Sequence, residues 1–169
     1  MFRNIAVATD GSSNANRAVE VGAKLAVACG ARLIVVHVAP TYLSLAEVES
    51  SEDLPQAVKE EIKRMRDAMG GFEMSAYAPV PAPQSAIEYL GNAVLDSADN
   101  IARESGMTDI SRVITYGNAA ERIVAEADTA KADLIVIGTR GLSDLGGLVM
   151  GSVSHKVIHL SACPCVTVK

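Results

Sequence analysis

The chain lacks the features that mark several large classes of protein. It has 169 residues, no tryptophan, three cysteines and a formal net charge of -5 at pH 7. A small, odd number of cysteines argues against a framework of disulfide bonds and fits a protein of a reducing compartment. The chain has no run of lysine or arginine, so we expect neither a nucleic acid nor an anionic membrane as its main partner, because both require a basic surface.

Long apolar runs are also missing. No stretch approaches the roughly 20 residues that cross a bilayer, and the first strand-like run begins at Asn4, which leaves no room for a signal peptide. We therefore expect a cytoplasmic protein without a membrane partner. Since 49% of the residues are hydrophobic, the chain is expected to form a single domain with one core.

What the sequence does contain is an alternation of short apolar runs with helical patterns. The runs are of the kind that form strands buried on both faces of a parallel sheet. Cap and stop residues bound the helical patterns between them. The predicted strands are 4–10, 32–38, 109–117, 132–138 and 164–169; the capping signals are Ser12 or Ser13, the Ser85 and Glu88 pair, and Asn118; the stop signals are Gly30 and Gly106.

This alternation predicts an α/β fold with a doubly wound, Rossmann-like, five-stranded parallel sheet in the order 3-2-1-4-5 and helices on both faces. In such a sheet the ligand crevice lies at the carboxyl ends of the strands where the winding reverses. The reversal falls between the first and fourth strands. We therefore expect the loops ATDGSSN and GTRG, which follow those strands, to meet.

The segment of about 42–84 is long for a connection and is predicted to be an insertion. Within it, apolar residues repeat on one face of a charged helix, and three prolines then predict an extended spacer. We favour packing of that face on its own chain over docking of a partner protein. The apolar residues are Leu54, Val58, Ile62, Met65 and Met69, and the prolines are Pro79, Pro81 and Pro83.

The loop after the fourth predicted strand has the chemistry of a phosphate site. Glycines at 138 and 141 let backbone N–H groups approach a phosphate oxygen. Gly151 and Ser152 open the last helix, whose first amides carry a partial positive charge. Ser152 and Ser154 offer hydroxyl donors, and Arg140 is the one cation of the loop.

These residues resemble a motif of the universal stress protein family, in its ATP-binding subgroup. The motif is a glycine, two residues, a second glycine, nine residues, a third glycine and then serine or threonine, and Gly138, Gly141, Gly151 and Ser152 match it. The resemblance continues in NIAVATDGS, LIVVHVAP, YGNAAERIVAEA, DLIVIGTRG and GSVSHKVIHLSACPCVTVK. It covers nearly the whole chain apart from the segment of about 42–84.

The resemblance implies an ATP site, a homodimer formed through the C-terminal strand and a regulatory role in stress adaptation. It places adenine against the backbone of Val38 and ribose near Asp10. A carboxylate at a strand end also suits ribose hydroxyls or a Mg²⁺ on the phosphates, or a cap for the helix at Ser12. The residues expected to line the site are Ala8, Thr9, Asp10, Val38, Ile137, Gly138, Arg140, Gly141, Gly151, Ser152, Val153 and Ser154.

Other site classes do not fit the residues. The chain has no glycine and lysine pair for a P-loop, no GxGxxG after the first strand and no GxSxG for a serine hydrolase. A receiver domain would need an acceptor aspartate after the third strand, where the chain has TYGNA. No base, nucleophile and orienting group converge, so no catalytic residue is predicted, although slow ATP hydrolysis is compatible with such a site.

Several other residues allow both a structural and a functional interpretation. Cys163 and Cys165 flank Pro164, and plain burial is favoured over metal binding or redox cycling. His155 is expected to be half-buried and structural rather than a general base, and His37 and His159 to be packing residues. Ser143 and Asp144 are ordinary loop residues, with Asp144 also able to position a water or a metal.

Two other functions remain open at this point. The chain could be a small adenylating or ATP-hydrolysing enzyme that uses the insertion as a lid. It could also be an interaction protein with a vestigial nucleotide site and a partner docked on the insertion.

Overall fold

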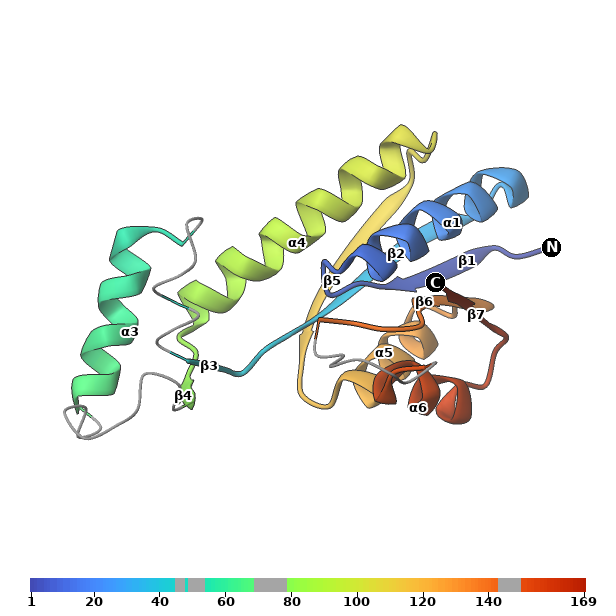
Figure 1. Ribbon diagram of the computed structural model, residues 1–169. Helices are drawn as coiled ribbons and strands as arrows, with labels where there is room; N and C mark the ends of the chain where they lie inside the picture. The colour runs from blue at the N-terminus through green and yellow to red at the C-terminus, as the bar shows by residue number, and fades with distance from the viewer. Residues whose placement is uncertain (45–47, 49–53, 69–78, 143–149) are drawn as a thin grey trace.

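A computed structural model of the chain describes residues 1–44, 48, 54–68, 79–142 and 150–169 (Figure 1). Its main sheet has five strands in the order β5-β2-β1-β6-β7, and each neighbouring pair is parallel. Counted among these strands alone, this is the predicted order 3-2-1-4-5, so the predicted α/β fold is confirmed. The strands are β1 (Asn4–Ala8), β2 (Arg32–Ala39), β5 (Ile110–Tyr116), β6 (Leu134–Gly138) and β7 (Cys165–Val168).

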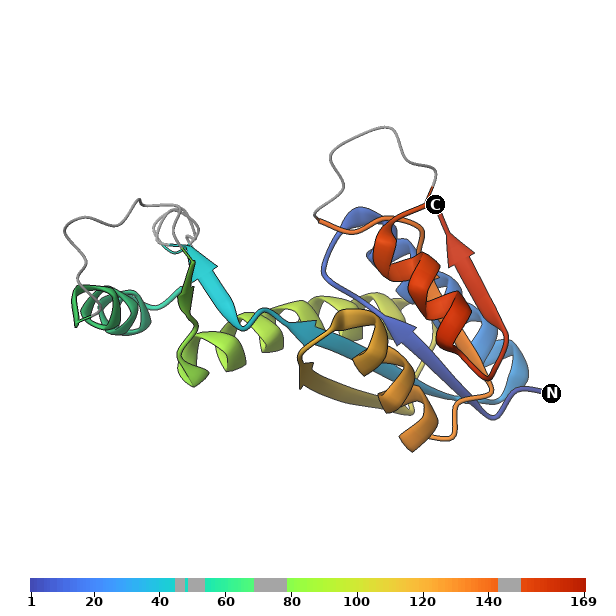
Figure 2. The same cartoon turned by 90° about the horizontal axis from the view of Figure 1, so that it is seen from below.

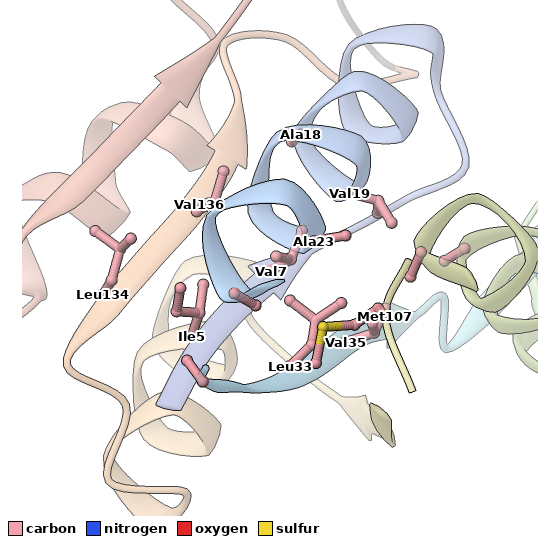
Figure 3. Close-up of a cluster of buried hydrophobic side chains, with 14 of the residues drawn as sticks. Ile5, Val7, Ala18, Val19, Ala23, Leu33, Val35, Met107, Leu134 and Val136 are labelled. Atoms are coloured by element: carbon pink, nitrogen blue, oxygen red, sulfur yellow. The ribbon is translucent and has the colours of Figure 1, made fainter. Parts of the chain in front are cut away.

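Helices cover both faces of this sheet (Figures 1 and 2). Helices α1 (Ser13–Cys29) and α4 (Gln84–Glu104) lie on one face, and α5 (Ala119–Thr129) and α6 (Ser152–Leu160) lie on the other. The side chains of a strand alternate between the two faces. Ile5 and Val7 of β1 therefore join the core under α1 and α4, which Figure 3 shows, whereas Ala6 and Ala8 join the core under α5 and α6.

Most helix ends match their sequence signals. The Ser12 hydroxyl accepts the Ala15 N–H at 3.3 Å, and Gly30 ends α1 in the left-handed region with φ 63°. The Asn118 side chain accepts the Glu121 N–H at the start of α5. At the end of α4, the Gly106 N–H reaches the Arg103 carbonyl and the next N–H reaches Ala102, a pairing that closes the last turn.

The predicted capping box at Ser85 and Glu88 is wrong. Helix α4 begins at Gln84 with Pro83 as its N-cap, and no side chain caps it. Proline disfavours helical backbone in the residue before it, so the boundary falls at Pro83 and Ser85 lies inside the first turn. The Ser85 hydroxyl instead donates to Glu61 at 2.7 Å.

The buried face of α4 is made mainly of small residues. Four larger apolar residues of this helix are half-buried, while the fully buried line consists mainly of alanine and glycine, which let the helix lie close to α1 and the sheet. The half-buried residues are Ile87, Leu90, Val94 and Ile101, and the buried ones are Ala86, Gly91, Leu95, Ala98 and Ala102.

The segment predicted as an insertion has elements of its own. Strands β3 (Tyr42–Ser44) and β4 (Pro79–Pro81) pair antiparallel, and α3 (Gln56–Ala68) lies between them in the chain. These elements lie at the N-terminal end of α4, away from the main sheet (Figures 1 and 2).

The apolar face of α3 packs on its own chain, as we favoured. Leu54 and Ile62 are buried in a small cluster with Ala86 of α4, and Val58 packs against it. Met65 is half-buried, and Met69 lies outside the described residues. The extended proline segment contains β4, a strand that the sequence pattern did not predict. Within the described part of the chain, no helix is long and apolar enough to span a membrane.

The cap at Ser12 gives a first prediction. Changing Ser12→Ala leaves one amide of the first turn of α1 without its acceptor, so the free energy of unfolding should fall by roughly 1 kcal/mol. Urea denaturation followed by circular dichroism measures this change. The matched control is Ser13→Ala, which removes an exposed hydroxyl at the next position and should change stability by less than about 0.5 kcal/mol; equal losses in both variants would contradict the capping role.

Candidate functional site

A cavity of about 370 Å³ opens at the carboxyl ends of β1 and β6. All the residues expected at a nucleotide site line this cavity, so the fold brings them together, and their binding of a ligand stays a prediction. Four further lining residues were not predicted: Ala15, Val36, Ala119 and Ile123. Val36 could have been found from the sequence because it shares a strand face with Val38, whereas the two α5 residues depend on how that helix lies on the sheet.

The wall of the cavity has an apolar part and a polar part. Strand residues such as Ala8 and Val38, together with Ile123 of α5, continue the core under α5 and α6. The loops after β1 and β6 and the first turn of α6 contribute Asp10, Arg140 and Ser152. An apolar wall beside a few convergent polar groups is the usual composition of a small-molecule site.

The start of α6 supplies backbone donors to this cavity. Gly151 is the N-cap, and no side chain caps the helix. The first amides of a helix have no acceptor within the helix and carry a partial positive charge. Ser152, Val153 and Ser154 all line the cavity, so this end of α6 is suited to an anion.

The backbone of Thr139 joins the loop after β6 to β7 and to the start of α6. Its N–H donates to the Val168 carbonyl of β7 at 2.7 Å, and its carbonyl accepts the Gly151 N–H, also at 2.7 Å. The Ser154 hydroxyl lies 3.0 Å from the same Thr139 carbonyl and 2.9 Å from the Gly151 carbonyl. One residue therefore joins the end of β6 to β7 and α6. The sequence analysis missed Thr139 because its contacts are made by main-chain atoms.

These bonds correct the role predicted for Ser154. The residue is 2% exposed and its hydroxyl donates to backbone carbonyl oxygens, so it holds the loop in place rather than donating to a phosphate. Ser152, by contrast, is exposed at the first position of α6. Ser154 still lines the cavity.

The two predicted loops meet at the carboxylate of Asp10. One oxygen, Oδ1, accepts the Ser12 N–H at 3.0 Å, and the other, Oδ2, accepts the Leu142 N–H at 2.9 Å. The first bond closes a turn onto Ser12, and because Ser12 itself is the N-cap of α1, the alternative that Asp10 caps this helix is wrong. The second ties the loop after β1 to the loop after β6.

Each glycine of the motif lies close to another part of the protein. A Cβ on Gly138 would lie 2.9 Å from the Asn14 carbonyl carbon, and one on Gly141 would lie 2.3 Å from Asp10 Oδ2. A Cβ on Gly151 would lie 3.3 Å from the Thr139 carbonyl oxygen. The motif thus brings α1, the two loops and α6 close together, in addition to leaving backbone amides accessible.

The histidines do not form an acid–base site. His37 is buried and its Nδ1 lies 2.9 Å from the Thr9 carbonyl oxygen, as expected of a packing residue. His155 and His159 stack edge to face with ring centroids 4.6 Å apart, and both are exposed. The expected partial burial of His155 and packing role of His159 are wrong, because this face of α6 points to solvent. Asp144 and Ser143 lie outside the described residues.

The cysteines favour the burial interpretation. Cys163 and Cys165 are half-buried and pack against the core under α5 and α6. Burial raises the pKa of the Cys165 thiol, which makes it less reactive at neutral pH. No group of three His, Cys, Asp or Glu residues suited to a metal occurs in the part of the chain that the structure describes.

Comparison with known proteins identifies similar chains along the full length. The model of the universal stress protein family matches residues 1–169. A universal stress protein of Thermus aquaticus is 33% identical, and the match covers 100% of both chains. A crystal structure of a universal stress protein in complex with cAMP is 30% identical, with a TM-score of 0.63 over 99% of this chain and 97% of that one. The protein UspA of Lactobacillus plantarum has a TM-score of 0.68 over 99% and 97%, and at 18% identity it supports the fold alone.

The contact of Gly138 gives a prediction that needs no ligand. Changing Gly138→Ala forces a Cβ against the backbone of Asn14 and Ala15, which cannot yield without moving α1, so stability should fall by roughly 1–3 kcal/mol.

The matched control for this change is Gly91→Ala in α4. There the nearest atom is the end of the Ile114 side chain at 3.1 Å, and alanine gains up to about 1 kcal/mol of helix propensity over glycine. Thermal unfolding of both variants should therefore show a loss for Gly138→Ala and little change or a gain for Gly91→Ala. The reverse order would refute the packing role of Gly138.

Proposed function

This chain belongs to the universal stress protein family, and we propose that it serves as a nucleotide-dependent regulatory module in stress adaptation, with ATP as its ligand. The observation that carries the proposal is the cavity at the β1 and β6 ends, where an apolar wall adjoins the uncapped start of α6. The apolar wall suits a purine base, and the amides of α6 with Arg140 suit phosphates.

A relative supports the class of ligand. The universal stress protein solved with cAMP is 30% identical to this chain over nearly its full length. An adenine nucleotide is therefore the first ligand to test, and the volume of about 370 Å³ falls within the roughly 300–1,000 Å³ of small-molecule pockets. We prefer ATP over a cyclic monophosphate because the lining includes both Arg140 and the start of α6, two separate positions for phosphate charge.

A Mg²⁺ ion held by the protein does not fit the described residues. Among them Asp10 is the one carboxylate that lines the cavity, and each of its oxygens already accepts a backbone amide. Mg²⁺ usually binds through one or two carboxylates and the phosphates of its substrate. We propose that Mg²⁺ arrives with the triphosphate and is held mainly by it.

We also propose a homodimer through β7 in a cytoplasmic protein. Strand β7 is an edge of the main sheet, and its residues are half-buried in the single chain. Unpaired strand edges favour association with a second strand. The thiols of Cys29, Cys163 and Cys165 are unpaired in the structure, which suits a reducing compartment.

Nucleotide binding is tested by calorimetry and by a variant that fills the cavity. The wild-type protein should release heat on titration with Mg-ATP, and native mass spectrometry of the purified protein should find a bound adenine nucleotide. Changing Ala119→Phe puts a ring into the lining and should weaken ATP binding at least tenfold, or about 1.4 kcal/mol. The control Ala93→Phe lies on the exposed face of α4 and should bind as the wild type does. Equal affinities of the two variants, or no heat with folded wild-type protein, would exclude this site.

The dimer is tested at Thr167. The Pro164 carbonyl accepts a bond from β6 and the Val168 carbonyl accepts one from Thr139, the residue after β6, so the alternate residue Thr167 presents its N–H to the open edge. Changing Thr167→Pro removes that donor without removing a β6 bond, and sedimentation should then show monomer where the wild type is dimeric. Thr167→Val keeps the N–H and should remain dimeric; a dimer in both variants would place the interface elsewhere.

A further inference from the structure

The carboxylate of Asp10 joins two loops of the protein in the absence of a ligand. Both oxygens accept backbone amides, from Ser12 at 3.0 Å and from Leu142 at 2.9 Å. Bonds from amides to an ionised carboxylate are stronger than bonds between neutral groups. Ser12 lies in the loop after β1 and Leu142 lies in the loop after β6, so the carboxylate joins the two loops.

Gly141 is fitted to the same carboxylate. A Cβ at this position would lie 2.3 Å from Oδ2, the oxygen that accepts the Leu142 N–H. Only a residue without a side chain lets the backbone come this close. Gly141 and the bond from Leu142 therefore form one contact, in which the chain of the second loop lies directly on Asp10.

This contact is one of two sets of hydrogen bonds that hold the loop after β6 at the cavity. At one side, Thr139 is bonded to β7 and to the start of α6. At the other side, Leu142 is bonded to Asp10. Arg140 and Gly141 lie between these two sets of bonds and line the cavity, so the position of their backbone depends on both.

We propose that Asp10 is a positioning residue, which acts on the phosphates of the nucleotide by holding residues 140–142 in place and not by contacting the ribose or a metal. The inference rests on the proposed function, since it presumes a nucleotide in this cavity. It revises the role that the resemblance implied for Asp10. The two roles predict different results when the carboxylate is removed. A positioning role weakens the binding of the phosphates, whereas a ribose contact weakens the binding of the nucleoside.

The test compares adenosine and ATP on the wild type and on Asp10→Ala. If Asp10 positions the loop, adenosine affinity should change less than twofold, while the gain in affinity from adenosine to ATP should fall at least tenfold. If Asp10 contacts the ribose, both ligands should weaken together and the gain should stay as in the wild type. That second result, or unchanged binding of both ligands, would overturn the proposal. Repeating the titrations with EDTA should give the same fall in the gain; a fall that appears only with Mg²⁺ would show a metal ligand instead.

A second variant keeps the carboxylate and disturbs the contact from the other side. Gly141→Ala places a Cβ against Oδ2 and should reproduce the loss seen in Asp10→Ala. The double variant should bind ATP no more weakly than either single variant, because both changes break one contact. Additive losses would overturn the proposal. Asp10→Asn, which keeps one acceptor oxygen, should fall between the wild type and Asp10→Ala.

Amide exchange of Leu142 tests the contact without a ligand. In the ligand-free wild type, NMR should show slow exchange of the Leu142 N–H, and Asp10→Ala should exchange at least tenfold faster, while the Gly30 N–H of α1 keeps its rate. Fast exchange in the wild type would overturn the contact itself. If the wild type binds neither adenosine nor ATP, the proposed function fails, and this experiment still decides whether Asp10 joins the loops.

Discussion

The parallel pairing of β1 with β6 decides where this molecule can hold a ligand. Strand β1 has β2 on its other side, so the chain connections leave β1 and β6 toward opposite faces of the sheet. The helix after β1 lies on one face and the helix after β6 lies on the other. The loops therefore diverge at their strand ends, and the space between them becomes the cavity. The bond from the Leu142 N–H to the Asp10 carboxylate bridges this divergence.

The strands and most helix ends could be predicted because their signals are local. Buried strands of a parallel sheet are continuous apolar runs, and a cap such as Ser12 or Asn118 needs only the residues next to it. The start of α4 shows the limit. Ser85 and Glu88 have the spacing of a capping box, yet Pro83 sets the boundary and Ser85 bonds to a residue of α3. A local pattern cannot show which of two competing local signals prevails.

The residues that line the cavity were largely predictable from the sequence, whereas most of their contacts were not. The motif and the strand ends named residues that do line the cavity, whereas their contacts depend on atoms distant in sequence. Asp10 and Leu142 are 132 positions apart, and Ser154 reaches a carbonyl 15 positions away. The sequence therefore suggested that the Ser154 hydroxyl donates to a phosphate, whereas in the structure it donates to backbone carbonyls of the loop. Ala119 and Ile123 were missed because their place depends on the angle at which α5 crosses the sheet.

The close contacts of the glycines also explain how an acidic chain can present the proposed anion site. A net charge of -5 gives no general attraction for phosphate, so the attraction has to be local. Short distances at Gly138, Gly141 and Gly151 bring the start of α6 and the backbone around Arg140 to one cavity. Amide dipoles fixed in this way need no compensating lysines and lose no side-chain entropy on binding.

The same backbone connects the cavity to the edge of the sheet. The Thr139 peptide donates to Val168 of β7 and accepts from Gly151 at the start of α6. A ligand on the α6 amides is thus separated from the edge strand by one residue and two hydrogen bonds. Such a path transmits a signal only if the residues along it have two discrete arrangements whose balance the ligand shifts. Thr139 is 5% exposed and closely bonded on both sides, so a change at α6 would have to move β7 with it or break one of these two bonds.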